Sequence, residues 1–251
     1  MDLYGWRYEG RKISDNLNGQ MLSIMQILND PSQVNNRTWG GSLQEYIGER
    51  LGISAGQVRT IKRMMEEVNI LIPGALNSQT VPCRETIYTE EGLMLLELFS
   101  IETLLQSNRS PRELMQIQEI RNIYRLHYQN VFVGYSFEND EGEILHPLRA
   151  TLKAVRQFGY LDYWEWYILN TIITKDDCEE DEARLEEVIR SYREGELRFT
   201  FEDIKENTLS HVYILGNFAS AGFFRIEGRK PDLRAYIESS VADLVDRILA
   251  S

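Results

Sequence analysis

One stretch, residues 42–98, constrains the fold more than any other part of the chain. Apolar residues recur at helical spacing over residues 43–51, and this spacing predicts a short amphipathic helix. A tight corner follows at residues 52–54, where Ser54 is a natural N-cap. We expect a second helix from there to about residue 69. One face of it is apolar and carries Val58, Ile61, Met64, Met65 and Val68.

The other face of that second helix is polar and basic. It carries Gln57, Arg59, Thr60, Lys62 and Arg63, and no acidic residue occurs between Ile53 and Arg63 in a chain whose net charge is −12. Two helices joined by a tight turn, the second with a polar and basic face, are the layout of a helix-turn-helix. A helical hairpin that only packs against its neighbours is the alternative.

The residues that follow extend this motif. Residues 80–88 contain enough β-branched side chains to predict a returning strand, and Thr89 is a natural N-cap for the next helix. Together the helices and this strand are similar to a winged helix, in which a strand leading into Tyr-Thr-x-x-Gly-Leu returns the chain to its core.

Charge is distributed unevenly along the chain. Residues 1–88 contain nine Lys and Arg and nine Asp and Glu, whereas the remainder contains 18 basic and 30 acidic residues and carries the whole net charge of −12. Phosphate affinity depends on the local patch rather than on the total, so this balance permits DNA binding by the first part. We expect the acidic remainder to weaken nonspecific binding.

Other features of composition narrow the setting. The chain has no apolar run of about 18 residues and no secretory signal at its start, so we expect a cytoplasmic protein that does not contact membranes. Cys83 and Cys178 lack metal-site spacing and are expected to be free thiols. Three scattered histidines add no zinc site, so we expect no metal.

A polar loop precedes the helix-turn-helix. Residues 33–41 are dense in amide side chains and contain Asn35, Asn36 and Arg37. Asn and Gln can pair with adenine, and Arg with guanine, in a major groove. Asn-rich loops are also ordinary turn chemistry, so both interpretations stay open.

At this point the chain resembles a known family. Gly5-Trp6, a basic-polar segment, a helix, Asn-Asp-Pro-Ser at 29–32 and the Asn-rich loop resemble the start of the DNA-recognition region of FokI-like type IIS restriction endonucleases. Residues 145–155 (LHPLRATLKAV) with 158–161 (FGYL) resemble the AlwI-type pattern, although His146 stands where that pattern often has Arg. Residues 213–224 (YILGNFASAGFF) and a helix at 232–249 are similar to the end of the module. The resemblance covers about two thirds of the chain and implies successive winged-helix subdomains that bind double-stranded DNA.

The second half of the chain predicts a separate unit. An apolar run passes into an acidic loop over residues 131–143, the best candidate boundary. Residues 144–251 are similar to a second winged helix, in which Pro147 begins a helix that ends at Gly159. The aromatic segment 161–173 is expected in the core. Residues 225–231 have the composition of a hairpin, and their three basic residues are candidates for phosphate contact.

No catalytic site is expected in this chain. The single Pro-Asp pair, Pro231-Asp232, is followed by no acid-x-Lys, and the acid-x-Lys at Asp203–Lys205 has its upstream acids in a highly charged run. No phosphate loop, nucleotide-binding glycine cluster or hydrolase Gly-x-Ser-x-Gly occurs. We therefore expect no cofactor in this chain. A nuclease domain or subunit would lie elsewhere, and Mg²⁺ would belong to that module.

The sequence thus predicts a mainly α protein with small β wings, built from tandem winged-helix or helix-turn-helix subdomains at 1–135 and 136–251. Its expected function is sequence-specific binding of double-stranded DNA as the recognition part of a type II restriction endonuclease. The alternatives are a winged-helix transcription regulator and a protein-interaction module that no longer binds DNA. The candidate DNA-binding residues are Arg7, Arg11, Lys12, Asn35, Asn36, Arg37, Gln57, Arg59, Thr60, Lys62, Arg63, Arg84, Arg149 and Lys153.

Overall fold

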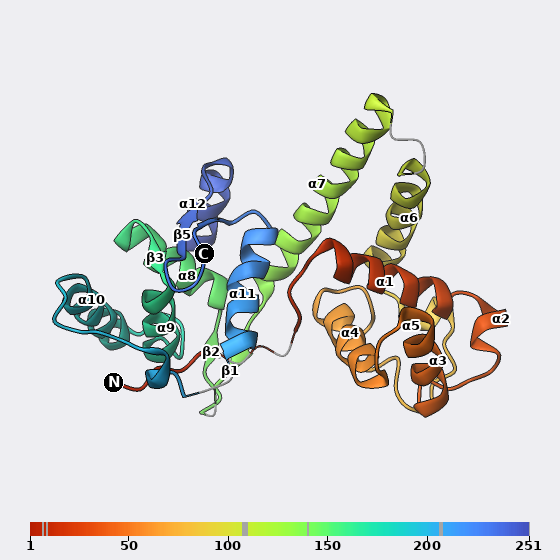
Figure 1. Ribbon diagram of the computed structural model, residues 1–251, viewed down its shortest axis with the longest axis horizontal. Helices are drawn as coiled ribbons and strands as arrows, with labels where there is room; N and C mark the ends of the chain where they lie inside the picture. Colours follow the sequence, from red (N-terminus) through yellow and green to blue (C-terminus); the bar gives the residue numbers. More distant parts are fainter. Residues whose placement is uncertain (7, 9, 107–109, 140, 206–207, 251) are drawn as a thin grey trace. The chain divides into compact units, whose positions relative to one another are not determined.

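The described part of the chain is mainly helical and contains two small sheets (Figure 1). A computed structural model describes residues 1–6, 8, 10–106, 110–139, 141–205 and 208–250. The chain forms two compact units, one of residues 9–131 and one of residues 1–8 with 132–251. None of the helices in these ranges is both long enough and apolar enough to cross a membrane.

The N-terminal residues join the second unit, which differs from the predicted division into 1–135 and 136–251. Trp6 is buried, and its ring meets that of Trp166 edge-on at 5.4 Å between centroids. Its indole N–H donates to the carbonyl of Ile173 at 2.8 Å. A buried tryptophan with its N–H satisfied anchors the chain firmly, so residues 1–8 fold with a partner more than 150 residues away.

The first unit is a cluster of helices. Its elements are α1 (Asp15–Leu28), α2 (Pro31–Val34), α3 (Gly41–Leu51), α4 (Ala55–Glu67), α5 (Arg84–Ile87), α6 (Glu90–Leu105) and α7 (Pro111–Gly134), of which α7 runs three residues past the boundary of the unit. Helices α1, α3, α4 and α6 lie together in Figure 1, and α1 contacts each of the other three.

The predicted pair of helices at residues 43–69 is present as α3 and α4. Ser54 caps α4 in a reciprocal box: its hydroxyl accepts the N–H of Gln57, and the Gln57 side chain accepts the N–H of Ser54. The predicted apolar face is confirmed, since Val58, Ile61, Met64, Met65 and Val68 are all buried. Burying side chains of this size contributes about 1.5–3 kcal/mol each, which fixes the rotation of α4 about its axis.

The predicted strand over residues 80–88 is wrong. This segment contains the short helix α5, and its strand pairing is a single bridge between Leu71 and Tyr88. Thr80 turns inward, donating its N–H to the carbonyl of Asn77 and its hydroxyl to that of Ala75. Pro82 lacks an N–H for a sheet ladder. Thr80 and Thr86 therefore stabilise turns through their hydroxyls, and the first unit has no two-stranded hairpin in its described part.

The start of α6 explains the predicted Thr-x-x-Gly pattern. The hydroxyl of Thr89 accepts the N–H of Gly92 at 2.9 Å, so Thr89 is the N-cap as expected. A Cβ added at Gly92 would lie 2.1 Å from the carbonyl oxygen of Ile70. Only glycine permits this close approach, which places the start of α6 against Ile70, in the segment just after α4.

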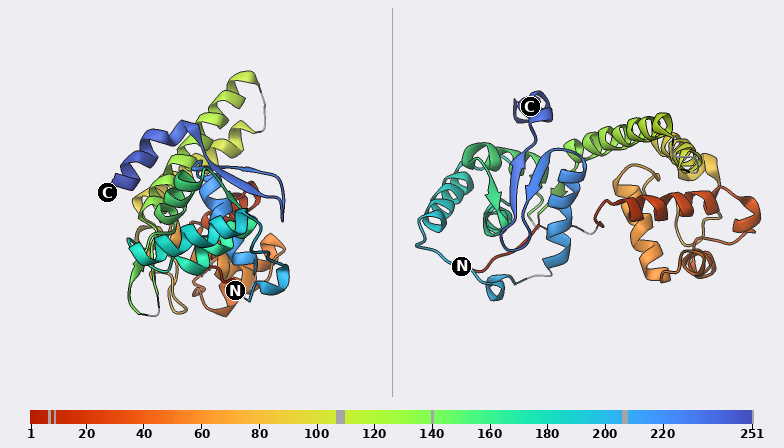
Figure 2. Two further views of the ribbon diagram at one scale, coloured as in Figure 1. Left: turned by 90° about the vertical axis from the view of Figure 1, so that its left-hand side faces the viewer. Right: turned by 45° about the horizontal axis from the view of Figure 1, so that its top comes forward.

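The second unit combines helices with an antiparallel sheet. Its elements are β1 (Phe137–Glu138), β2 (Ile144–Leu145), α8 (Pro147–Phe158), β3 (Leu161–Asp162), α9 (Tyr163–Ile172), α10 (Glu179–Arg193), α11 (Thr208–Ser220), β4 (Phe224–Glu227), β5 (Arg234–Ile237) and α12 (Ala242–Ala250), with 3₁₀ turns at Phe201–Asp203 and Ser239–Val241. Strands β1 and β2 form one hairpin, and the other sheet has the order β3-β5-β4 (Figure 2). The hairpin expected around residues 225–231 is present, with Ile226 opposite Ala235. The helix expected over residues 232–249 is wrong in its first half, because residues 234–237 form strand β5 paired with β4, and α12 begins only at Ala242.

Helix α9 forms the core of this unit, as its aromatic composition predicts. Tyr163, Trp166 and Tyr167 are buried, and so is the carboxyl group of Glu165. Arg193 of α10 pairs with this buried carboxylate at 2.5 Å. The same guanidinium donates to the carbonyls of Phe158 and Tyr160, both at 3.0 Å. Arg193 therefore joins α10 to the turn between α8 and β3.

Replacing Arg193 should destabilise the second unit strongly. In Arg193→Ala the buried Glu165 carboxylate loses its ionic partner, which costs about 3 kcal/mol. Arg190→Ala is the matched control on the same helix, because Arg190 is largely exposed and, within the described part of the chain, pairs with Glu186 one turn away and with no other carboxylate. The control should change the unfolding free energy by less than about 0.5 kcal/mol. Denaturant unfolding measures both, and equal effects would contradict this role of Arg193.

His127 should make the first unit sensitive to acid. It is buried on α7, its Nε2 lies 2.7 Å from the carbonyl oxygen of Val68, and burial lowers its pKa below the ordinary value. A lowered pKa gives stability that is present above the unfolded value of about 6.5 and is lost as the pH falls below it. His127→Gln keeps a donor for the carbonyl but cannot titrate.

Thermal unfolding of wild type and His127→Gln between pH 8 and pH 5 tests this expectation. The wild type should lose more stability than the variant as the pH falls through 6.5, while other titrating groups contribute equally to both proteins. Parallel pH profiles for the two proteins would contradict it.

Candidate nucleic-acid interface

The outward face of α4 is polar because its apolar face is buried. Gln57, Arg59 and Arg63 are exposed on it, and Thr60 is half-buried with its hydroxyl donating to the carbonyl of Gly56 at 3.1 Å. Arg59, Thr60 and Arg63 follow one side of the helix, whereas Gln57, two residues before Arg59, lies about 160° around the axis from it. The side of α4 that carries Arg59 and Arg63 therefore faces solvent within the first unit.

Arg59 is held in place by a neutral group. Its Nη1 donates to the side-chain oxygen of Gln44 at 3.1 Å, and Gln44 is buried on α3. Among the described residues, no carboxylate lies within ion-pair distance of Arg59. The guanidinium is thus positioned without being neutralised, and its remaining N–H donors stay available to an acceptor outside the protein.

The two cations that follow on α4 have acidic partners. Lys62 pairs with Glu66 at 2.6 Å, only 17% of its side chain is exposed, and Glu66 also accepts the N–H of Gly74 at 2.8 Å. Arg63 lies 3.8 Å from Glu67, but 59% of its side chain is exposed. Lys62 therefore acts mainly in joining α4 to the loop that follows it. An exposed pair such as that of Arg63 is weak and leaves the cation accessible.

Acidic residues border the start of α4. Glu45 and Glu49 of α3 line the same open hollow as Ser54 and Gln57. Read along the chain, residues 53–63 contain no acid, but folding places these two carboxylates near the helix N-terminus. They disfavour a phosphate at that end of α4 and favour contact further along, where Arg59 and Arg63 lie.

A second basic cluster lies on α3 and the loop before it. The guanidinium carbon of Arg37 lies 4.7 Å from the centroid of the Tyr46 ring, and that of Arg50 lies 5.4 Å from it. Sequence reasoning named Arg37 but missed Tyr46 and Arg50, although their spacing of four residues on a helix places them side by side. The neighbours Asn35 and Asn36 are exposed, with left-handed φ values of 46° and 58°.

The remaining candidates of the first unit are dispersed. Lys12 is exposed, Arg11 is half-buried with Nη1 3.4 Å from the side-chain oxygen of Gln20, and Arg84 lies 3.8 Å from Glu97. Arg7 lies outside the described residues. None of these contacts joins Lys12, Arg11 or Arg84 to the cluster on α4.

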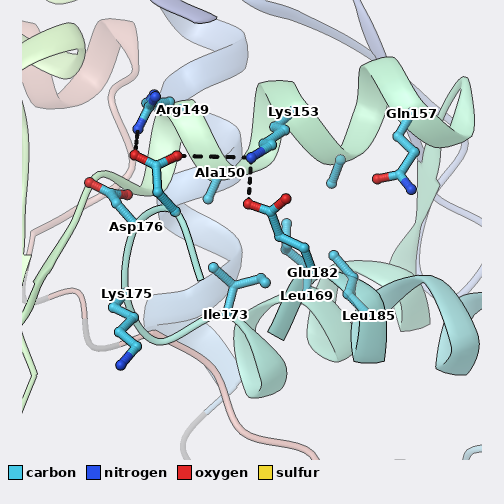
Figure 3. Close-up of a pocket in the computed structure, with 12 residues that line it drawn as sticks. Arg149, Ala150, Lys153, Gln157, Leu169, Ile173, Lys175, Asp176, Glu182 and Leu185 are labelled. Atoms are coloured by element: carbon cyan, nitrogen blue, oxygen red, sulfur yellow. Dashed lines mark hydrogen bonds and ion pairs between the residues drawn. The ribbon is translucent and has the colours of Figure 1, made fainter. Parts of the chain in front are cut away.

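The candidates of the second unit are paired with acids. Arg149 donates to Asp177 at 2.7 Å, and Lys153 pairs with Glu182 and lies 3.9 Å from Asp177 (Figure 3). The Asp177 carboxylate raises the pKa of Arg149, and that guanidinium lowers the pKa of Asp177. The cavity that these residues line is only about 40 Å³. The acidic segment 176–182 thus neutralises the exposed face of α8.

The hairpin of the second unit carries cations of two kinds. Arg225 pairs with Glu227 across one residue, and Lys230 lies over the ring of Tyr163 at 5.3 Å. Arg229 is exposed at the hairpin turn, and Arg234 stacks on Tyr160 at 5.0 Å. Burial lowers the pKa of Lys230. Arg229 and Arg234 have no carboxylate partner in the described part of the chain.

The described residues include no group of three His, Cys, Asp or Glu side chains that would bind a metal ion. Asp203 of the acid-x-Lys candidate accepts the N–H of Thr200 at 2.7 Å, and Lys205 donates to the carbonyl of Glu202 at 2.9 Å. Asp203 thus serves local turn structure, and Lys205 also pairs with Asp2 at 3.5 Å. Cys83 and Cys178 are free thiols.

The sequence matches no known protein-family model, and no curated protein is significantly similar to it. The function must therefore be argued from the geometry of the chain itself. The α3–α4 pair is the feature with the clearest chemical character, since it exposes arginines held by uncharged partners.

Proposed function

We propose that this chain binds double-stranded DNA sequence-specifically, as the recognition domain or subunit of a type II restriction endonuclease. The observation that carries the proposal is the exposed guanidinium of Arg59, positioned by the buried amide of Gln44 with no carboxylate partner among the described residues. A fixed arginine on the outward face of the second helix of a helix-turn-helix is suited to donate to the O6 and N7 atoms of guanine.

Further hydrogen-bond donors lie on the exposed surface of α4. Gln57 uses its side-chain oxygen in the helix cap, which leaves its NH₂ group free to donate to a base or phosphate. Arg63 is exposed one turn beyond Arg59 and lies 3.8 Å from Glu67. A recognition helix needs several such groups on one side, and α4 supplies Arg59 and Arg63 there, while Gln57 lies at its N-terminal end on another side.

The topology of the second unit supports a winged-helix fold for it. Helix α8, strand β3, helices α9 and α11 and the hairpin β4–β5 follow in the order helix, strand, helix, helix, strand, strand, with α10 inserted. The third strand lies between the other two, in the order β3-β5-β4. In this proposal the hairpin is the wing, and Arg229 and Arg234 are its candidates for phosphate contact.

The two units would then have unequal roles. Arg149 and Lys153 of α8 are already neutralised, and residues 213–220 of α11 include no basic side chain. We therefore assign sequence discrimination to α4 of the first unit, whereas the hairpin of the second unit would contact the phosphates of the DNA backbone. Its acidic surface limits nonspecific binding.

The restriction context rests on the resemblance of segments 1–41, 145–161 and 213–249 to FokI- and AlwI-like recognition regions. In this proposal the nuclease active site lies on another segment or subunit, and Mg²⁺ serves that module. Selection of duplexes from a random library by the full chain, followed by footprinting, tests the proposal. An enriched short sequence supports it, and no enrichment at low salt overturns it.

On the selected duplex, Arg59→Ala should weaken binding by about 1–3 kcal/mol and relax the preference at one base pair. Arg149→Ala is the charge-matched control, and it should change binding far less because Asp177 already neutralises Arg149. Gel shifts at fixed salt measure both variants. Equal effects, or none for Arg59→Ala, would remove α4 from the role of recognition helix.

A further inference from the structure

We propose that Arg37, Tyr46 and Arg50 form a phosphate clamp, a second DNA contact separate from the reading face of α4. The ligand is a backbone phosphodiester. This inference rests on the proposed function and deepens it, because it assigns to α3 and the preceding loop a contact that does not depend on sequence.

Both guanidinium groups are fixed around one aromatic ring. Arg50 donates to the hydroxyl of Tyr46 through Nη2 at 2.9 Å and Nε at 3.2 Å. Arg37 lies over the ring and donates through Nη1 to the carbonyl of Gln33 at 2.8 Å. Both guanidinium groups lie within 5.4 Å of the centroid of the Tyr46 ring. Two cations held around one ring repel each other, the ring relieves only part of that repulsion, and an anion bound by both would relieve more of it.

The groups that hold this pair are uncharged. A carbonyl, a phenol and an aromatic ring fix the two arginines, and no carboxylate of the described residues lies within ion-pair distance of either. Asp30 is the nearest acid in the network, and its carboxylate accepts from Ser32 and from the side chain of Gln33. Those hydrogen bonds lower the pKa of Asp30, so its carboxylate stays ionised, and it is engaged in capping the N-terminus of α2.

Glu45 and Glu49 lie on the same helix, and both line the hollow at the start of α4. At about 100° per residue, Glu45 lies about 100° and Glu49 about 60° from Tyr46 on α3. Within the described residues, neither glutamate is within ion-pair distance of Arg37 or Arg50. Gln44, which holds Arg59, is about 200° from Tyr46 on the same helix. The clamp and the reading arginine therefore lie on different sides of α3.

This arrangement favours phosphate over a base edge. Stacking and hydrogen bonds to the protein restrict each guanidinium, and a phosphate with several acceptor oxygens can receive donors from both. To contact a base edge, a side chain must extend into the groove. Arg37 instead stacks on the ring of Tyr46, which keeps its guanidinium beside α3. Each contact of this kind releases about one counterion from DNA.

The test uses the full chain and two probes. With the selected duplex, Arg37→Ala and Arg50→Ala should each lower the slope of log K against log salt concentration by about 1, equally on cognate and unrelated duplexes. Arg125→Ala, an exposed arginine of α7, is the control and should leave the slope unchanged. Tyr46→Phe keeps the ring but removes the acceptor for Arg50, and it should weaken binding less than Arg50→Ala.

The second probe is inorganic pyrophosphate, followed by NMR of the arginine Nε–H signals. The signal lost in Arg50→Ala should shift on titration in the wild type and in Arg125→Ala. If pyrophosphate shifts it but no duplex is bound, the anion site stands and the proposed function fails. If duplex is bound with an unchanged salt slope in both arginine variants, or if pyrophosphate leaves the signal in place, the clamp is overturned.

Discussion

The burial of the apolar stripe on α4 is the constraint on which the candidate interface depends. Val58, Ile61, Met64 and Met65 are enclosed by the first unit, so the helix has one stable rotation about its axis. Because the residues between them have no alternative position, Arg59 is directed to solvent. The cap at Ser54 fixes where the helix begins, and hence the phase of the whole pattern. Packing and function are thus joined on one helix.

The partner of each cation decides its chemical role more than its position in the sequence does. Arg59 is held by an amide and Arg50 by a phenol, so both keep their charge for an external anion. Arg149 and Lys153 have carboxylate partners and mainly join α8 to the acidic segment beside it. Arg193 goes further, since its partner Glu165 is buried and the pair stabilises the fold.

Local sequence patterns predicted most of the helices but failed for the segment before α6 and for residues 232–241, where strand β5 stands in place of the expected helix. The stripe of α4, the caps at Ser54 and Thr89 and the hairpin after Phe224 depend on contacts a few residues apart, which a sequence displays directly. The strand expected over residues 80–88 needed a partner strand. The N–H and hydroxyl of Thr80 form hydrogen bonds within turns instead of with a neighbouring strand. A β-branched composition alone does not decide between a strand and a turn.

The sequence by itself determined the mainly helical class, the two-helix pattern of residues 43–69 and its polar, basic face, because helical periodicity and capping are local properties. Tertiary structure alone decided that Trp6 folds with Trp166, and which cations form ion pairs with distant acids, as Arg149 does with Asp177 and Arg193 with Glu165. These facts depend on side chains distant in the chain meeting in space. Coulomb and packing energies depend on the distance between two side chains in space, and the order of residues along the chain does not give that distance.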